Sequence, residues 1–446
     1  MRSVLGWTAL AMVILAMALI IYADDIQIVE SSAREIPTIY NIRFFGVKII
    51  DGISIFLIGV VGAYLLFRER ITVTSFHRQM GIIFLVYCYA GMVGFIYSFF
   101  YQYDYLIWLQ DFQPVIYMAG FFLIVYHVID TLPKWKLFVT ALLLFMAAKN
   151  LLILYWTFTG IGRSFDGWAF RASQNSEFTY FPMMFFPFLL LVFKKCPRAL
   201  KIPIIVVLAV YLFNSLVGIY RTVWVMIMLG SLYLLTQLDG KTRLKMLLYG
   251  TLSLALVINV VAIFFPRFLD LAWSFKFASI FEWSVYGDRS NATRTLEIMN
   301  VVNYVFSHFA FLQGMGLGAW WDDSARRLLP DFGSGFTFKR RFTTTHMLYF
   351  TQLLKLGLVA MFFFWRAIYK MFITVARYVR TMPWDRWEKS VLLGMNVGFL
   401  CALISSALFP RLFLIIGVNM ALAASFMSLE RKELGSATGH SEGGKA

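Results

Sequence analysis

Two arginines occupy positions where an unpaired charge would be costly. Arg221 lies in Tyr-Arg-Thr-Val-Trp, between two apolar runs that leave almost no loop, and Arg411 follows Pro410 in a similarly short break. A guanidinium stays charged in proteins, and its planar fork matches a phosphate bidentately. Desolvating it at a membrane boundary without a partner is expensive. The spacing therefore predicts a phosphate site at a membrane boundary. The alternative for Arg221 is a side chain that reaches to lipid headgroups.

Two longer polar segments supply further arginines on the same predicted side of the membrane. Two of them precede an amphipathic stretch that ends at Phe306, and two others precede the sixth apolar run. The arginine set comprises Arg163, Arg171, Arg221, Arg289, Arg294 and Arg411. At headgroup level such a set suits a lipid-linked pyrophosphate, whose charge stays at the surface while its chain stays in the bilayer. Arginine could also stabilise a departing pyrophosphate in place of a divalent metal.

His346 is the candidate general base. It lies in Thr-Thr-Thr-His-Met, where the long polar segment meets the next apolar run. A histidine titrates near neutral pH and could remove the proton from an attacking sugar hydroxyl. The alternative is a histidine hydrogen-bonded at a helix N-terminus. His308 lies in the middle of the polar segment and is less well placed, whereas His77 and His127 are expected near the cytoplasmic side.

Other motifs limit the function classes. The sequence Gly314-Met-Gly-Leu-Gly318 permits a close backbone turn but is too short for a nucleotide loop. Ser-x-x-Lys, His-Glu-x-x-His and Walker sequences are absent, which leaves peptidase and ATPase functions without support. The cysteines Cys88, Cys196 and Cys401 lack metal-ligand spacing, and packing is the simplest role for them. No metal and no cofactor is therefore expected.

These residues must be positioned by membrane helices. The chain has 446 residues, of which 60% are hydrophobic and 14% charged, and this composition excludes a soluble globular protein. Crossing the hydrocarbon core takes roughly 20 apolar residues. Apolar runs recur at 4–22, 49–67, 80–100, 113–129, 137–156, 179–193, 202–218, 222–237, 246–265, 347–365, 391–409 and 412–428. We therefore predict an all-α, polytopic transmembrane bundle of about twelve helices.

The runs divide the chain into four parts. Nine helices are expected within residues 1–265, one large loop at 266–346, and three helices within 347–430. Residues Met1–Ala23 are expected to be a retained first helix, because they lack a clear cleavage site. Residues 431–446 are small and polar, which predicts a disordered tail.

The distribution of charge predicts which side each loop faces. The net charge is +16, and the short loops on one side are consistently basic, whereas the loop at 101–112 carries Asp104 and Asp111 without a positive charge. Basic short loops face the cytoplasm. Both termini are therefore expected in the cytoplasm and the large loop in the periplasm, across a bacterial inner membrane. Positive charge beside anionic lipid gives no reason to expect nucleic acid. The segment Arg366–Lys389 predicts an amphipathic helix on the inner leaflet.

The order of these motifs resembles the superfamily of O-antigen polymerases and O-antigen ligases (Wzy and WaaL), which are bacterial inner-membrane glycosyltransferases with a GT-C-like fold. The resemblance rests on four elements: the loop around Arg221, the start of the large loop at Arg294, the sequence Gly314-Met-Gly-Leu-Gly318, and His346. His346 is followed by Gln352-Leu-Leu-Lys-Leu-Gly-Leu358. It covers the chain from about residue 150 to residue 428. Three positions depart from the family pattern: Tyr220, Met347 and Lys355 stand where Ser, Asn and Glu are usual.

The resemblance implies a metal-independent, inverting glycosyltransferase. A glycan would pass from undecaprenyl pyrophosphate to a sugar hydroxyl at the periplasmic face, with Arg221 and Arg294 holding the pyrophosphate and His346 as base. The rest of the arginine set is added as substrate-binding residues from position alone. The expected partners are an undecaprenyl-pyrophosphate-linked oligosaccharide, membrane lipid and a chain-length regulator. A polysaccharide polymerase is the leading expectation.

Three alternatives remain open. An O-antigen ligase would transfer a finished polymer to lipid A core, and the motifs do not separate it from a polymerase. A metal-dependent glycosyltransferase using polyprenyl phosphate sugars would use acidic residues such as Asp24 and Asp25 after the first helix. A transporter of lipid-linked oligosaccharides would need charged or broken helices near the midplane. Lys149 and Lys355 are the candidates for that role.

Overall fold

The protein is mostly helical in a computed structural model. The structure describes residues 2–22, 43–44, 47–48, 52–53, 55–57, 59–60, 73–159, 202, 209–210, 221–264, 289–322, 341–343, 345, 348–383, 386–404 and 410–439. Predicted helices at 49–67, 179–193 and 202–218 fall largely outside these residues. The total of about twelve crossings therefore stays a prediction.

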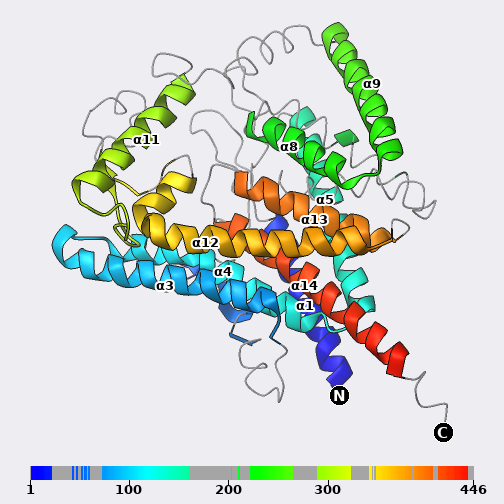
Figure 1. Ribbon diagram of the computed structural model, residues 1–446, viewed down its shortest axis with the longest axis horizontal. Coiled ribbons are helices and arrows are strands. Elements are labelled where there is room, and N and C mark those ends of the chain that lie inside the picture. The colour runs from blue at the N-terminus through cyan, green and yellow to red at the C-terminus, as the bar shows by residue number, and fades with distance from the viewer. Residues whose placement is uncertain are drawn as a thin grey trace.

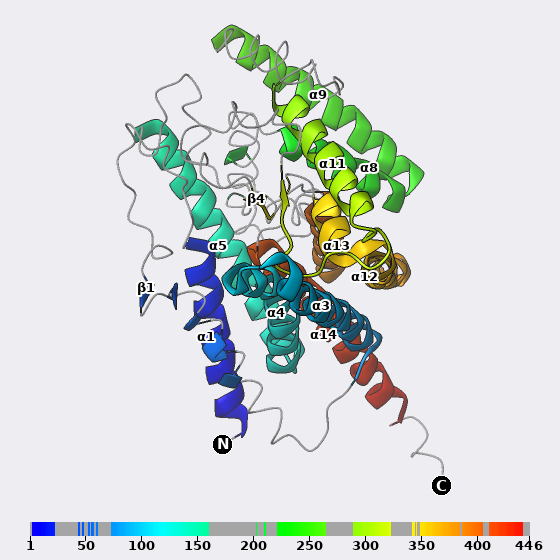
Figure 2. The ribbon, with the colours of Figure 1, turned by 90° about the vertical axis from the view of Figure 1, so that its left-hand side faces the viewer.

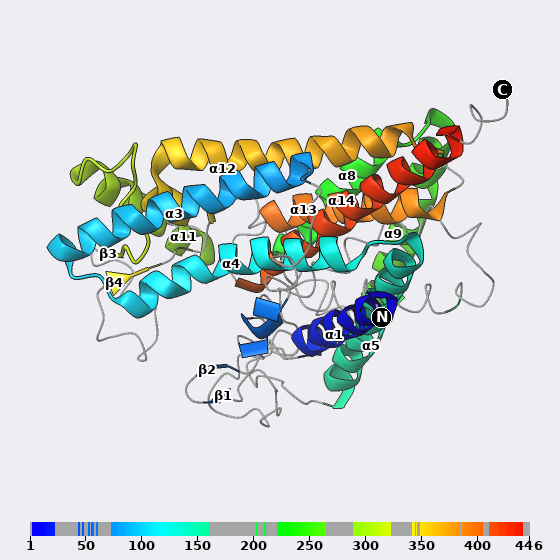
Figure 3. The same cartoon turned by 90° about the horizontal axis from the view of Figure 1, so that it is seen from below.

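Four described helices are long and apolar enough to cross a membrane, which identifies a membrane protein. They are α3 (Ser75–Tyr101), α4 (Tyr105–Val128), α12 (Leu348–Thr381) and the part Phe413–Lys432 of α14 (Pro410–Gly439). Helices are expected here because lipid offers no hydrogen bonds to unpaired backbone groups. Figure 3 shows these four helices running along the length of the molecule, with α12 packed on α3 and α14 packed on α4.

The remaining helices flank this group on two sides. In Figure 2, α1 (Arg2–Tyr22) and α5 (Leu132–Thr159) lie on one side, and α8 (Arg221–Gln237), α9 (Gly240–Phe264) and α11 (Arg289–Ser307) lie on the other. Helix α13 (Trp387–Ile404) packs against α8, α12 and α14. Two short antiparallel pairs complete the described elements: β1 (Arg43–Phe44) with β2 (Val47–Lys48), and β3 (Trp321–Asp322) with β4 (Arg341–Phe342).

Close packing of small and aromatic residues joins the helices. A side chain added at Gly417 of α14 would overlap the backbone of Met118 on α4, so the two helices approach closely at a glycine. Trp135 of α5 is fully buried, and its indole N–H donates to the carbonyl of Leu422 at 2.9 Å. Its ring also contacts Phe426. These contacts hold both α4 and α5 against α14.

Three sequence predictions differ from the structure. Asp111 lies within α4 instead of a loop, because α4 begins at Tyr105, directly after its N-cap Asp104. The segment after Arg366 continues α12 to Thr381 instead of forming a separate surface helix, because the buried stripe of α12 extends through it. Helix α14 reaches Gly439, so the first residues of the predicted disordered tail are helical. The amphipathic stretch before Phe306 is confirmed as α11.

Candidate functional site

The glycine turn, residues 310–318, fills a break in α12. Gly357 interrupts the helix with φ +67°, which divides α12 into a short arm (348–356) and a long arm (358–381). Figure 1 shows the short arm bending away from the long arm. Carbonyls of Leu354 and Lys355 accept from the N–H groups of Met315 (2.7 Å) and Gly316 (3.0 Å). Backbone groups freed by the break are thus hydrogen-bonded, as buried backbone requires.

The backbone N–H groups on the other side of the break are hydrogen-bonded in the same way. The N–H groups of Leu358 and Val359, which start the long arm, donate to the carbonyls of Phe311 (2.9 Å) and Leu312 (3.2 Å). The turn also reaches α3, where the carbonyl of Ala90 accepts from Leu317 N at 2.9 Å. The glycine turn is therefore bonded through its backbone to two membrane helices.

Glycine is required at several of these positions. Gly314, Gly316 and Gly318 have φ of +76°, +82° and +81°, a region that other residues rarely adopt. A side chain at Gly316 would overlap the backbone of Gly94 in α3, and one at Gly314 would overlap the backbone at Gly357. The glycine pattern in the sequence therefore reflects close backbone contact.

An ion pair lies beside the glycine turn. The ammonium of Lys355 contacts Asp111 Oδ1, and the two side chains are only 6% and 10% exposed. The second carboxylate oxygen, Oδ2, accepts from Gly318 N at 2.8 Å. The sequence identifies Lys355 as a candidate intramembrane charge, but it does not identify Asp111 as the partner. One signal in the sequence places Asp111 on the buried face of a helix: its helical spacing with Val115 and Met118, both of which are buried in α4.

Aromatic side chains cover the outer side of the turn. Tyr103, in the connection between α3 and α4, donates its hydroxyl to the carbonyl of Met315 at 3.2 Å. Burial raises the pKa of the Tyr103 phenol well above its ordinary value of 10.0. The ring of His308 packs against Tyr101 and Tyr304. Its Nδ1 lies 2.8 Å from the Tyr304 carbonyl, and in the tautomer with the proton on Nδ1 the ring donates to this oxygen. His308 therefore caps the end of α11.

The arginine set is described in part. Arg221 is the first residue of α8, Arg289 is the first residue of α11, and Arg411 is the second residue of α14. Arg294 is half-buried on α11. The candidate base and two of the arginines lie outside the described residues: His346, Arg163 and Arg171.

Three of these arginines share one structural feature, a position at the start of a helix. The first turn of a helix has unpaired N–H groups and a partial positive charge. A cation there is unfavourable by a few tenths of a kcal/mol to about 1 kcal/mol, whereas an anion is favourable. An arginine at such a position increases the positive potential that a phosphate would meet.

The helices that carry these arginines are linked by packing. Helix α8 packs on α13, α13 packs on α12 and α14, and α11 packs on α12. In Figure 1, the first turns of α8 and α11 lie above the N-terminal half of α12. Among the residues that the structure describes, no group of three His, Cys, Asp or Glu side chains could hold a metal ion. Cys88 is a free, exposed cysteine on α3.

No protein-family model matches this chain, and a search of curated proteins gives no match.

Proposed function

We propose that the protein is a polysaccharide polymerase of the bacterial inner membrane. It transfers a glycan from undecaprenyl pyrophosphate to an acceptor sugar hydroxyl at the periplasmic face. The observation that carries the proposal is the placement of Arg221, Arg289 and Arg411 at the starts of three helices. Cations at helix N-termini are unfavourable alone and become favourable beside a polyanion such as pyrophosphate.

The proposed roles follow from the chemistry of glycosyl transfer. The acceptor hydroxyl oxygen attacks the anomeric carbon, the bond from that carbon to the pyrophosphate oxygen breaks, and the configuration inverts. The hydroxyl proton passes to His346. Arg221 and Arg294 stabilise the charge that develops on the departing pyrophosphate. The other members of the arginine set bind the donor, and no divalent metal is needed.

The test compares two arginines near helix starts. Arg221→Ala should abolish long surface glycan in a deletion host while the protein still inserts in the membrane. Arg243 is a matched control, because it lies in the first turn of α9 and donates to the Leu238 carbonyl at 2.9 Å. Arg243→Ala should leave the glycan unchanged. Normal polymer from a stably inserted Arg221→Ala protein would remove Arg221 from the site.

The same host separates a polymerase from a ligase. Loss of long chains, with single repeat units left on the carrier lipid or on lipid A, supports the polymerase. Full-length chains that accumulate on the carrier lipid and are missing from lipid A would support an O-antigen ligase.

One observation favours a second candidate, a transporter of lipid-linked oligosaccharides. Transporters use broken helices and intramembrane charges, and α12 combines the break at Gly357 with the buried pair of Lys355 and Asp111. A transporter should tolerate His346→Ala, whereas a glycosyltransferase that uses this base should lose activity.

A further inference from the structure

The pair of Asp111 and Lys355 does more than neutralise two charges. A buried ion pair is weak evidence for stability, since apolar residues of similar size often stabilise a protein equally well. Here each partner is also bonded to the glycine turn. Asp111 accepts from Gly318 N, and the Lys355 carbonyl accepts from Gly316 N. The ion pair joins these two contacts, so α4, the glycine turn and the short arm of α12 form a closed set of bonds.

We propose that Asp111 and Lys355 form a latch that positions the glycine turn and the short arm of α12 for the reaction. The short arm starts at Leu348, two residues after His346 in the sequence. Its orientation therefore limits where the candidate base can lie. Asp111 and Lys355 are positioning residues, and this role rests on the proposed function.

The bonding of Asp111 explains why this position carries a carboxylate. Its two oxygens serve different donors, with Oδ1 contacting the Lys355 ammonium and Oδ2 accepting from the Gly318 N–H. A lysine at position 111 could restore a charge pair with an aspartate at position 355. It could not accept from Gly318, because an ammonium has no acceptor. Exchanging the two charges therefore keeps a charge pair but removes the hydrogen bond from Gly318 N.

The experiment measures access to the glycine turn in the purified full-length protein. Cys88, Cys196 and Cys401 are replaced by serine, and Ala319, which is fully buried next to Gly318, is replaced by cysteine. A polar maleimide then labels the single thiol in detergent solution. In the parent protein we expect slow labelling, because the turn is held against α3 and α12.

Two double variants test the latch. The apolar pair Asp111→Leu with Lys355→Met leaves no unpaired charge and should keep the melting temperature within a few degrees. It should label at least tenfold faster and lose long glycan at least tenfold in cells. The charge exchange Asp111→Lys with Lys355→Asp should behave in the same way, whereas Lys355→Arg should stay within twofold of the parent.

A matched control uses the ion pair at the other end of the molecule. Lys134 and Asp130 lie 2.7 Å apart, and Asp130→Leu with Lys134→Met should change neither labelling nor glycan. Parent-like labelling and glycan in both double variants of the latch would overturn the proposal. If only the charge exchange behaves like the parent, the pair is a structural charge contact and the latch is wrong. Labelling does not require glycosyl transfer, so it tests the latch even if the parent makes no polymer and the proposed function fails.

Discussion

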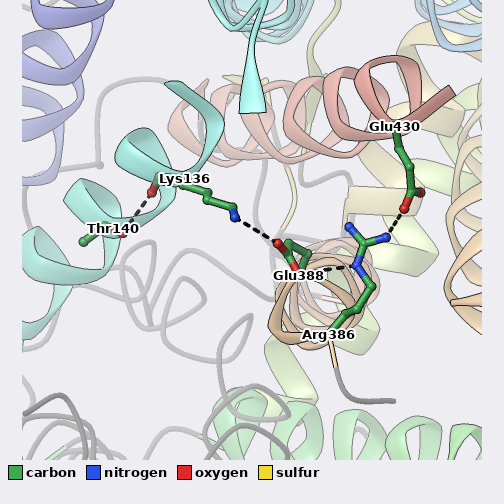
Figure 4. Close-up of polar contacts among 5 residues, drawn as sticks. All are labelled: Lys136, Thr140, Arg386, Glu388 and Glu430. Carbon is green, nitrogen blue, oxygen red and sulfur yellow. Dashed lines mark hydrogen bonds and ion pairs between the residues drawn. The ribbon is translucent and has the colours of Figure 1, made fainter. Parts of the chain in front are cut away.

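The two ends of the helix bundle are held together by different kinds of contact. At the glycine-turn end, backbone hydrogen bonds join residues 310–318 to α3 and α12, and one buried ion pair supports them. At the opposite end, side chains form the ion network of Lys136, Arg386, Glu388 and Glu430, which joins α5, α13 and α14 (Figure 4). Arg386 contacts both glutamates, and Lys136 approaches Glu388 at 3.4 Å.

This difference predicts how each end responds to amino-acid substitution. Backbone contacts between glycines leave no space for another atom, so the contacting glycines at this end should tolerate almost no substitution. The ion network includes partly exposed side chains, with Arg386 at 31% and Lys136 at 48% exposure. Partly exposed charges are screened by water and can rearrange. The bundle therefore has one end with a single defined geometry and one end that can adjust.

The largest effect is expected at Gly316. In Gly316→Ala, the new methyl group would overlap the backbone of Gly94, and φ of +82° adds strain. We expect a loss of more than about 3 kcal/mol in stability and little inserted protein. Gly81→Ala on α3 is the control, because a side chain there meets no neighbour within 4 Å. Its effect should stay within about 1 kcal/mol. Equal melting temperatures for the two variants would show that the turn is not closely packed.

A smaller loss is expected at Arg386, the central cation of the ion network. Arg386→Met leaves Glu388 and Glu430, which are 9% and 16% exposed, without their shared partner. Glu388 keeps its contact with Lys136. Losing a hydrogen bond to a charged group costs about 1.5–3 kcal/mol, and we expect a loss of this size in detergent melts. Arg377→Met removes an exposed arginine on α12 and should be neutral. A neutral result for Arg386→Met would mean that the network contributes no stability.

Much of the helical fold could be predicted from the sequence, because lipid allows few alternatives to an apolar helix. The helix starts at Arg221 and near Arg411 follow from breaks of a few residues between apolar runs. The break at Gly357 could not be predicted, since the apolar run at 347–365 continues across it. Whether a glycine interrupts a helix depends on the segment that replaces its hydrogen bonds. Here that segment lies about 40 residues earlier, at 310–318.

The candidate site was predictable in part for a related reason. Arginine positions follow from local spacing, so their location at helix starts could be expected. The partner of Lys355 is separated from it by 244 positions, and one sequence contains no information on that pairing. The glycine turn was visible as a pattern, but its contact with Gly94 on α3 requires the tertiary structure.

Lys136 should matter least within the ion network. Its side chain is 48% exposed, and Glu388 keeps Arg386 as a partner when Lys136 is changed. Lys136→Met should cost less than about 1 kcal/mol, and 1 M salt should remove most of the difference. Lys355→Met is the comparison at the glycine-turn end, where burial prevents screening and the loss should persist in salt. A salt-independent loss for Lys136→Met would contradict the difference between the two ends.

The smallest effect is expected at Asp239, which lies between α8 and α9. Its exposed carboxylate accepts from Thr242 N at 3.1 Å, and hydrogen bonds with Thr242 lower the pKa of Asp239 below its ordinary value of 3.8. A lowered folded pKa means that the ionised form stabilises the helix start above the unfolded pKa. That contribution is lost as the pH falls through the folded pKa. Asp239→Asn keeps a capping oxygen but cannot ionise. The variant should melt slightly below the parent at pH 6, and the difference should disappear in acid. A difference that persists at the lowest pH would show that ionisation of Asp239 is not its cause.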